Sequence, residues 1–595
     1  MASAAAGSTT AVPPGPEPSP ASPAGRAGGG RWSPSPTLAT ALALGLVAVG
    51  FGLPLIGILR GQGPAMEEGF MLVFPERVLA GDIPNKDFLH LYGPGSLWFL
   101  AGVYELFGVH ITVERLAGLA QHVGVVTGMW FLARPWGRPL ATVVALVTLV
   151  VLLPPTGLIA LAWIGALAFG VWAVWAALRA RAAEPGSRSE GRWATGAGLL
   201  VAGALLFRPD LVLASSLGVG AALWGGTRRR WLRFATGLAV GLTPYLIHLV
   251  TAGPWTAFEG MVIEPVFDLR GGRRLPVPPS PDRLTGFLQQ VSEFGQLEWP
   301  LPTFDTAEQN AIWFWLMFGV VAVLVGTGAW AVRRNPGSVP CRTLLAVGLF
   351  SLGLLPQGVQ RVDGTHFAWA SAVSIGFLPV GLSVLLRGRA GRTPVRHLVA
   401  GALVVALVVL VLPNHTVRRY ADYVGQTFGS HRVFGYPISW EGRTFYYGRE
   451  DVALAVDDLL PAVDRVSEPG DRLFVGPRDL RQTPYSDAYL YYLLPDLPPA
   501  THYIEMDPGV ADAEGSGLAE DLASADVVIL SRVWDAWVEP NDSREVGSDE
   551  PVRVLEDRFC LVGSYGERRD GDPTSPTEGD PLYDLYAPLD SGDCG

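Results

Sequence analysis

Long apolar runs recur along the first 413 residues of the chain and are separated by short polar connectors. A membrane-spanning helix needs about 20 mostly apolar residues, and these runs approach or reach that length. They lie at 38–59, 113–134, 138–154, 157–180, 193–207, 209–226, 231–253, 311–332, 342–357, 366–387 and 397–413. The pattern predicts a polytopic α-helical membrane protein with about eleven transmembrane helices.

Arginine-rich connectors predict the orientation of these helices. They contain Arg134 and Arg138, the arginines within 179–192, those at 228–230 and 333–334, and those within 387–396. The positive-inside rule assigns such connectors to the cytoplasm. All of them fall on one side if the eleven runs cross the membrane, which places the N-terminus in the cytoplasm. The apolar stretch 95–109 cannot then be a span, and we expect an interfacial helix on the outer face.

The same pattern divides the chain into three parts. Residues 1–36 are rich in Ala, Pro, Gly and Ser and are expected to form a disordered cytoplasmic tail. Residues 37–413 form the transmembrane domain, with external loops at 60–113 and 253–310. Residues 414–595 form an extracytoplasmic soluble domain. Its sequence predicts helices at 451–466 and 488–494 and short apolar strands at 472–475 and 526–530, which indicates an α/β domain.

Charge and cysteine content narrow the classes of function. The net charge of the 595 residues is −11, and most of the 55 acidic residues follow Trp440. This acidity argues against a nucleic-acid partner. The three cysteines, Cys341, Cys560 and Cys594, do not have the spacing of a metal site. Cys560 and Cys594 would share an oxidising compartment, so a disulfide and a loose tail both remain open.

Two adjacent acids, Glu67 and Glu68, follow the first apolar run directly. They lie where a membrane protein meets water on the outer side, a suitable place for a general base acting on a substrate that arrives on a lipid. They could equally bind a metal ion or the donor. The alternative is an acidic, solvated loop without a chemical role.

Further ionisable residues lie in other external segments. Arg208 and Asp210 lie at the ends of two neighbouring apolar runs. They either bind a lipid phosphate or pair with each other, and we favour the pair. Three ionisable groups in six residues (Arg361, Asp363 and His366) are costly between apolar spans unless they face a polar cavity. Arginine also suits a phosphate as a bidentate donor. We expect a substrate role for this cluster, with an interfacial turn as the alternative.

The first external loop resembles that of the GT-C glycosyltransferases, in particular bacterial members related to protein mannosyltransferases and to the aminoarabinose lipid A transferases. The resemblance rests on four segments: Glu67-Glu68-Gly69, the segment from Leu79 to Pro84, Asp87-Phe88-Leu89-His90, and Gly93-Pro94-Gly95. It covers roughly residues 38–410. The first acid of the family pair is usually Asp and is Glu67 here. The lipid A transferases also use a lysine near the end of this loop, where this chain has Gly93-Pro94-Gly95, so Lys86 or an arginine would take that role.

The resemblance implies a membrane glycosyltransferase that moves a hexosyl or pentosyl group from a polyprenyl-phosphate sugar to a cell-envelope glycan, lipid or protein. Glu67, or else Glu68, would deprotonate the acceptor hydroxyl, and the reaction would invert the anomeric centre. Arg361, His366 or Lys86 would stabilise the leaving phosphate. Asp87 and His90 would orient substrate or support the base; the alternatives are a helix cap and an interfacial histidine. Whether a divalent cation lies beside the two glutamates stays open.

Two other classes of protein fit some of these features. A transporter keeps polar groups near the bilayer midplane and often carries inverted repeats, whereas the charges here cluster at the outer ends of the runs. A non-catalytic membrane scaffold would display the C-terminal domain. It would have no cavity that joins Glu67, Arg208 and Arg361, because only a catalytic site requires these groups to converge.

Overall fold

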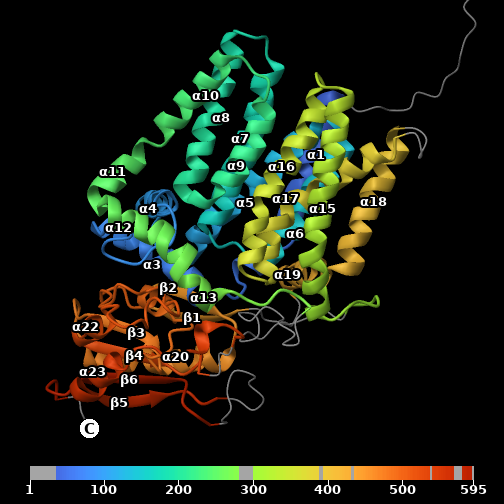
Figure 1. Ribbon diagram of the computed structural model, residues 1–595. Helices are drawn as coiled ribbons and strands as arrows, with labels where there is room; N and C mark the ends of the chain where they lie inside the picture. The colour runs from blue at the N-terminus through green and yellow to red at the C-terminus, as the bar shows by residue number, and fades with distance from the viewer. Residues whose placement is uncertain are drawn as a thin grey trace, which may run out of the picture.

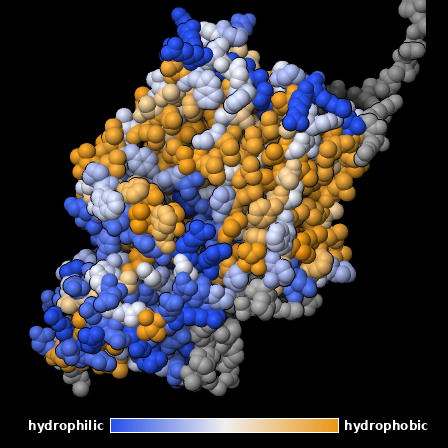
Figure 2. Space-filling view, viewed as in Figure 1, coloured by the Kyte–Doolittle hydropathy of each residue, from blue (hydrophilic) through white to orange (hydrophobic). Residues whose placement is uncertain are grey.

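A computed structural model describes residues 35–279, 299–387, 393–429, 435–535, 539–568 and 579–592. The predicted N-terminal tail lies outside these residues, apart from its last two positions. Helices of the first 411 residues stand side by side, and a small domain with a β-sheet lies against one end of them (Figure 1). Hydrophobic side chains cover the flank of the helices in a broad band (Figure 2). Hydrophilic side chains gather at the far ends of the helices and over the small domain.

Helices occupy the eleven predicted apolar runs, and the runs differ in whether their helices are long and apolar enough to span a membrane. Eight helical segments of the described residues are long and apolar enough to cross a membrane. They are α5 (Ile111–Ala133), α6 (Arg138–Thr156), α7 (Ala162–Ala182), the pair α10 (Arg228–Gly241) and α11 (Thr243–Ala252), α15 (Thr306–Arg334), α16 (Val339–Gln360), α17 (Gly364–Leu385) and α18 (Thr393–Val411). The other three predicted runs contain α1 (Pro36–Gly52), α8 (Arg188–Phe207) and α9 (Val212–Leu223). The chain is therefore a multi-pass membrane protein.

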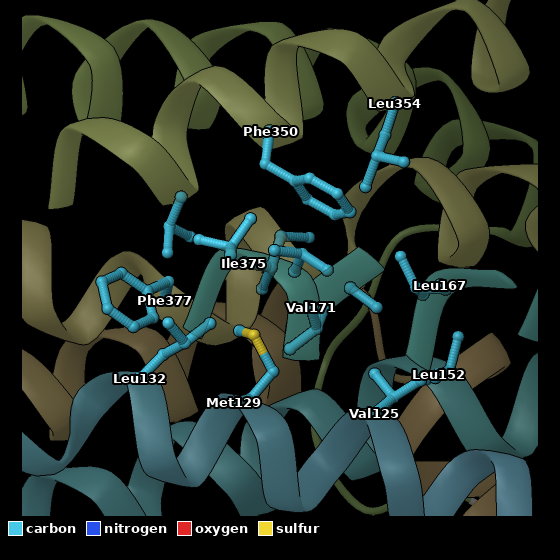
Figure 3. Close-up of a cluster of buried hydrophobic side chains, with 14 of the residues drawn as sticks. Val125, Met129, Leu132, Leu152, Leu167, Val171, Phe350, Leu354, Ile375 and Phe377 are labelled. Carbon is cyan, nitrogen blue, oxygen red and sulfur yellow. The ribbon is translucent and has the colours of Figure 1, made fainter. Parts of the chain in front are cut away.

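Interlocking side chains and small residues hold these helices together. Val125 and Met129 of α5 meet Phe350 of α16 and Phe377 of α17 in a dry cluster in the middle of the bundle (Figure 3). Lipid tails are as apolar as these side chains, so close packing must supply much of the association energy. Gly198 of α8 illustrates this, since a methyl group there would clash with the backbone of α10.

Two helices of the first external loop lie between the membrane helices and the sheet domain. The short helix α2 (Leu55–Leu59) leads into α3 (Glu67–Ala80), which ends at Gly81 in the left-handed conformation. The predicted interfacial segment is α4 (Gly95–Phe107), a 13-residue helix whose Leu106 and Phe107 are exposed. Apolar side chains exposed at the end of a short helix suit a position in the membrane interface.

The second external loop and the segment after α18 are also helical where the structure describes them. The loop contains α12 (Pro254–Phe258), a π-helical segment at Glu259–Asp268 and α13 (Leu269–Arg273). After α18, a π-helical turn at Asn414–Arg418 leads into α19 (Arg419–Thr427), which packs against α2. This packing brings the end of the membrane domain back to the beginning of the first external loop.

The C-terminal domain has the predicted α/β character. Its hairpin joins β1 (Tyr436–Trp440) and β2 (Arg443–Tyr447). Its main sheet has the order β3 (Leu473–Pro477), β4 (Val527–Ser531), β6 (Tyr583–Pro588) and β5 (Phe559–Tyr565), and only the β3–β4 pair is parallel. The helices are α20 (Glu450–Val466), α21 (Tyr489–Leu493), α22 (Leu518–Ala523) and α23 (Glu550–Arg558). Both predicted helices and both predicted strands are confirmed. Cys560 is disulfide-bonded, while Cys594 lies outside the described residues.

The first external loop and the C-terminal domain share one hydrophobic core. Phe70 and Phe74 of α3 belong to the same buried cluster as Phe445 of β2, Leu459 of α20 and Tyr489 of α21. Separating the domain from the loop would expose these large side chains to water, at about 25 cal/mol for each Å² of apolar surface. The loop that carries the two glutamates is therefore fixed by the soluble domain.

Candidate functional site

A cavity of about 790 Å³ lies between the C-terminal domain and the ends of the membrane helices that face it. Its wall includes the beginnings of α3, α5 and α17, the turns after α8 and α16, and α13. The C-terminal domain closes it with Tyr447, Tyr485, Glu505, Asp507 and Trp534. The molecular face is hollowed and hydrophilic just above this domain (Figure 2). Seven of the predicted site residues line the cavity: Glu67, Glu68, Arg208, Asp210, Arg361, Asp363 and His366.

The two adjacent glutamates have different surroundings. Glu68 is fully buried and receives two hydrogen bonds from Arg115, at 2.6 Å from Nε to Oε1 and 2.7 Å from Nη2 to Oε2. The same guanidinium donates to the carbonyl oxygens of Leu59 and Gly61, at 3.0 and 2.9 Å. Arg115 thereby joins α5 to the beginning of the first loop. Both oxygens of Glu68 are committed to this pair.

Glu67 faces the cavity and is held by the C-terminal domain. The Tyr485 hydroxyl donates to Oε2 of Glu67 and accepts the backbone N–H of Met66 at 3.1 Å. The Tyr485 ring packs against Trp534, with ring centroids 4.3 Å apart. Burial raises the pKa of the Glu67 carboxyl, while the Tyr485 hydrogen bond and the charges of Arg273 and Arg361 act against that rise. Burial therefore makes this carboxylate a stronger base than a solvent-exposed glutamate.

Arg361 and Asp363 form a buried charged turn between α16 and α17. The Arg361 guanidinium donates to the carbonyl oxygen of Arg273 at 2.8 Å and to Glu539 at 2.6 Å, and lies 3.2 Å from Asp363. Asp363 caps α17 by accepting the backbone N–H of His366, and it also meets the His366 ring at 3.0 Å. Burial favours the neutral acid, but His366 and Arg361 outweigh it and lower the pKa of Asp363 to about 2. The prediction that this cluster faces a polar cavity is consistent with these contacts.

Arg208 and Asp210 pair with each other, the reading that we favoured from the sequence. The pair is bidentate, at 3.1 Å from Nε to Oδ1 and 2.8 Å from Nη2 to Oδ2. The Arg208 guanidinium also lies over the rings of Tyr92 and Trp163, at 4.1 and 5.2 Å from their centroids. Aromatic faces stabilise a cation without using its N–H groups. Arg208 is thus fixed in the cavity wall with donors left for an anion.

Three predicted site residues are not among those that line the cavity. Lys86 is exposed, because its turn projects into solvent. Asp87 accepts a hydrogen bond from the backbone N–H of Ile83 at 2.7 Å and so closes a turn. This role is similar to the helix cap that we considered as the alternative to a substrate contact. His90 is buried beside Phe74, Phe88 and Tyr92, and burial lowers its pKa to about 3, which keeps the ring neutral. These residues shape the loop, and we do not place them in contact with substrate.

Residues that the sequence did not single out complete the site. Arg115 had a detectable signal, since a charged pair, Glu114-Arg115, begins an otherwise apolar run. Arg273 pairs with Asp507, at 2.7 Å from Nε to Oδ1, and joins the second external loop to the C-terminal domain. Tyr485, Glu505 and Asp507 follow no motif, and only the fold brings them to Glu67.

The question of a cation beside the glutamates can be tested on the donor set. Within the described ranges, no group of three or more His, Cys, Asp or Glu side chains is arranged to hold a metal ion. Glu68 is also occupied by Arg115. A metal bound to Glu67 would therefore need ligands from the substrate.

Comparison with known proteins identifies the fold. The chain resembles ArnT from Cupriavidus metallidurans, in a crystal structure bound to undecaprenyl phosphate, with a TM-score of 0.51, 14% identity, and coverage of 93% of this chain and 99% of that chain. An oligosaccharyltransferase from Archaeoglobus fulgidus also matches, with a TM-score of 0.44, 12% identity, and coverage of 90% of this chain and 75% of that chain. So does the mycobacterial arabinofuranosyltransferase AftD, with a TM-score of 0.40, 16% identity, and coverage of 92% of this chain and 41% of that chain. No family model and no curated protein sequence matches.

The chain shares its overall fold with ArnT, in line with the resemblance that we noted in the first external loop. At such low identity the likeness to ArnT concerns the fold alone. The fold class predicted from the sequence is thereby confirmed: a polytopic helical membrane protein with a C-terminal domain built on a small sheet.

Proposed function

We propose that this protein is a membrane glycosyltransferase that moves a sugar from a polyprenyl-phosphate donor to a hydroxyl group of an extracytoplasmic acceptor. One observation carries the proposal. Glu67, a buried carboxyl with a raised pKa, shares the wall of a large cavity with Arg208, Arg273 and Arg361, next to the membrane helices. ArnT, which shares the fold, has been crystallised with undecaprenyl phosphate. A base opposite a cluster of cations suits the transfer of a group away from a phosphate.

In the proposed reaction, the acceptor oxygen attacks the anomeric carbon from the face opposite the phosphate, and the configuration inverts. Glu67 takes the hydroxyl proton as the new carbon–oxygen bond forms. The bond between the anomeric carbon and the phosphate oxygen breaks, and its electron pair leaves with the polyprenyl phosphate. A phosphate is already an adequate leaving group, so charge stabilisation by arginine replaces an acid.

The arginine side chains have specific places in this scheme. Arg208 is held by Asp210 and by two aromatic rings, while Arg361 is held by Asp363, Glu539 and the carbonyl oxygen of Arg273. Both side chains line the cavity. Such fixed donors bind a phosphate without first losing side-chain freedom. His366, which lines the same wall beside Trp369, lies next to Arg361 and would contact the same phosphate.

The proposed orientation places the cavity on the outer side of the membrane. The arginine-rich connectors precede or follow the ends of the helices remote from the C-terminal domain, where hydrophilic side chains gather in Figure 2. The positive-inside rule assigns those ends to the cytoplasm. The N-terminus would then be cytoplasmic and the C-terminal domain extracytoplasmic, in a cell membrane. The acceptor would be a glycan, lipid or protein of the cell envelope.

The rival classes explain the cavity less well. A transporter would carry its charged site near the bilayer midplane, yet residues of the C-terminal domain, Tyr485 and Trp534 among them, close this cavity. A scaffold would not bring together Glu67, Arg208 and Arg361, and all three line one cavity. A transferase needs both a cavity closed by the C-terminal domain and the convergence of these three residues within it.

Donor turnover tests the proposal. The protein in nanodiscs would receive a panel of polyprenyl-phosphate hexoses and pentoses with an envelope extract, and mass spectrometry would follow free polyprenyl phosphate. We expect Glu67→Gln to lower turnover by about 10²- to 10⁴-fold while the donor still binds. Glu105→Gln is the matched control, because Glu105 lies on α4 of the same loop and is exposed. If the wild type leaves every donor intact and binds none, the protein is not a transferase of this kind, and transport assays follow.

A further inference from the structure

One buried acid of the cavity wall lacks a hydrogen bond on one of its carboxyl oxygens. Glu505, in the C-terminal domain, is 5% exposed, and the buried Oε2 of its carboxyl makes no hydrogen bond with the residues that the structure describes. Two residues further on, Asp507 is 1% exposed and gives only Oδ1 to Arg273, so its Oδ2 also lacks a hydrogen bond. Both residues line the cavity.

Unpaired buried carboxyl oxygens are costly, so two of them on neighbouring residues call for a ligand. Leaving such a group without a hydrogen bond costs about 1–3 kcal/mol or more, and proteins rarely tolerate it. Folds retain this cost mainly at functional sites. Burial and the nearby Asp507 raise the pKa of Glu505 well above its ordinary value, because both disfavour the charged carboxylate.

The surroundings decide which ligand chemistry fits. Glu505 interacts electrostatically with Glu67, Arg208 and Arg273, and Tyr92 lies within the influence of the same acids. A phosphate would be repelled by Glu505 and Asp507 and attracted to the arginines instead. A metal ion finds no third protein ligand among the described residues and would compete with Arg273 for Asp507. Neutral hydroxyl groups remain, because they can donate hydrogen bonds to both carboxyl oxygens without any net charge.

We propose that Glu505 and Asp507 form a recognition subsite for the ring hydroxyls of a sugar bound beside Glu67. The arginines of the membrane domain hold the phosphate, and the C-terminal domain selects the glycosyl group. This inference rests on the proposed function and adds its specificity-determining residues. The sugar is either the one carried by the donor or the one that accepts it, since both must lie within reach of Glu67.

Binding measurements on matched lipids test the subsite. The full-length protein in nanodiscs would be titrated with a polyprenyl phosphate and with the sugar-bearing lipid that the turnover panel identifies. If the donor sugar occupies the subsite, the wild type prefers the sugar-bearing lipid, and Glu505→Ala weakens that preference by about 10- to 100-fold without changing the affinity for bare polyprenyl phosphate. If the acceptor sugar occupies it, donor binding is unchanged and the acceptor KM rises by a similar factor.

Stability and a control variant distinguish recognition from a structural role. Glu505→Gln removes an unpaired buried charge, so we expect its Tm to equal or exceed that of the wild type, whereas a residue that supports the fold would lower it. Glu520→Gln is the matched control, because Glu520 is exposed on α22 of the same domain. An active wild type whose lipid preference and acceptor KM survive Glu505→Ala overturns this inference alone. A wild type that neither turns over nor binds any donor overturns the proposed function as well.

Discussion

Replacing Tyr485 by Phe tests whether the C-terminal domain tunes Glu67, the base that we propose. The substitution removes one oxygen atom, which donates to Glu67 and accepts the backbone N–H of Met66. A hydrogen bond to a charged group contributes about 1.5–3 kcal/mol, and one pKa unit corresponds to about 1.36 kcal/mol. The loss of the Tyr485 bond should therefore raise the pKa of Glu67 further, by about 1–2 units.

The sign of the effect on activity follows from the role of the base. A general base works only when it is deprotonated, so kcat rises with pH through the pKa of Glu67. In Tyr485→Phe that rise moves to higher pH by about 1–2 units. At a pH below both pKa values, kcat falls by about 10-fold for each unit. The donor KM should change little, because the phosphate-binding arginines are untouched.

The assay is turnover of the identified donor across the pH range in which the protein stays folded. Tyr491→Phe is the matched control. Its hydroxyl also accepts a buried backbone N–H, from Val475 at 2.8 Å, in the same domain, but it does not contact Glu67. Both variants should lose similar stability, and only Tyr485→Phe should shift the pH profile. A lower kcat with an unchanged profile would show that Tyr485 only supports packing, and the assignment of Glu67 as base would lose its main electrostatic argument.

Three further predictions concern other parts of the site and the fold. Glu68→Gln leaves the buried Arg115 without its counter-ion and should destabilise the protein by about 3–5 kcal/mol. Thermal unfolding should show a far larger loss of stability for this variant than for Glu67→Gln. Equal losses of stability would contradict the division of roles between the two acids. Arg361→Lys keeps the positive charge but loses the planar guanidinium, so donor affinity should fall by about 10-fold while binding of the acceptor stays the same. An unchanged donor affinity would remove Arg361 from the phosphate site. Gly198→Ala should lower the stability by about 1–3 kcal/mol because the new methyl group meets the backbone of α10. Gly196→Ala on the same helix meets nothing within 4 Å and is its control, and equal Tm values would refute close packing of α8 on α10.

The sequence predicted the helices and the position of the acids because both depend on local patterns. An apolar run of membrane length has few alternatives to a spanning helix, and arginine connectors orient it. The interfacial helix α4 followed from the topology, since a span at that point would have reversed every later connector. The acidic pair was visible because two carboxyl groups stood alone at the end of an apolar run.

Which glutamate is held by an arginine could not be read from the pair itself. Adjacent residues on a helix point about 100° apart, so the two acids of α3 meet different surroundings. The choice depends on Arg115, which lies 47 positions later and reaches back to Glu68. Lys86 attracted attention as the only lysine of the chain, but its place in an exposed turn depends on how the loop packs.

The cavity residues of the C-terminal domain could not be predicted from the sequence, because they lie far along the chain from Glu67. Tyr485 reaches Glu67 across more than 400 positions because the segment around it packs directly on the beginning of α3: the backbone N–H of Tyr489 donates to the carbonyl oxygen of Ala65 at 3.2 Å. A side chain at Gly69 would clash with the backbone of Ala488 and Tyr489, so glycine permits this approach. Glu67 and the domain that closes the cavity are therefore packed directly against each other. Any movement of the domain would displace Glu67 relative to the arginines of the membrane helices, and the transfer that we propose depends on the position of both.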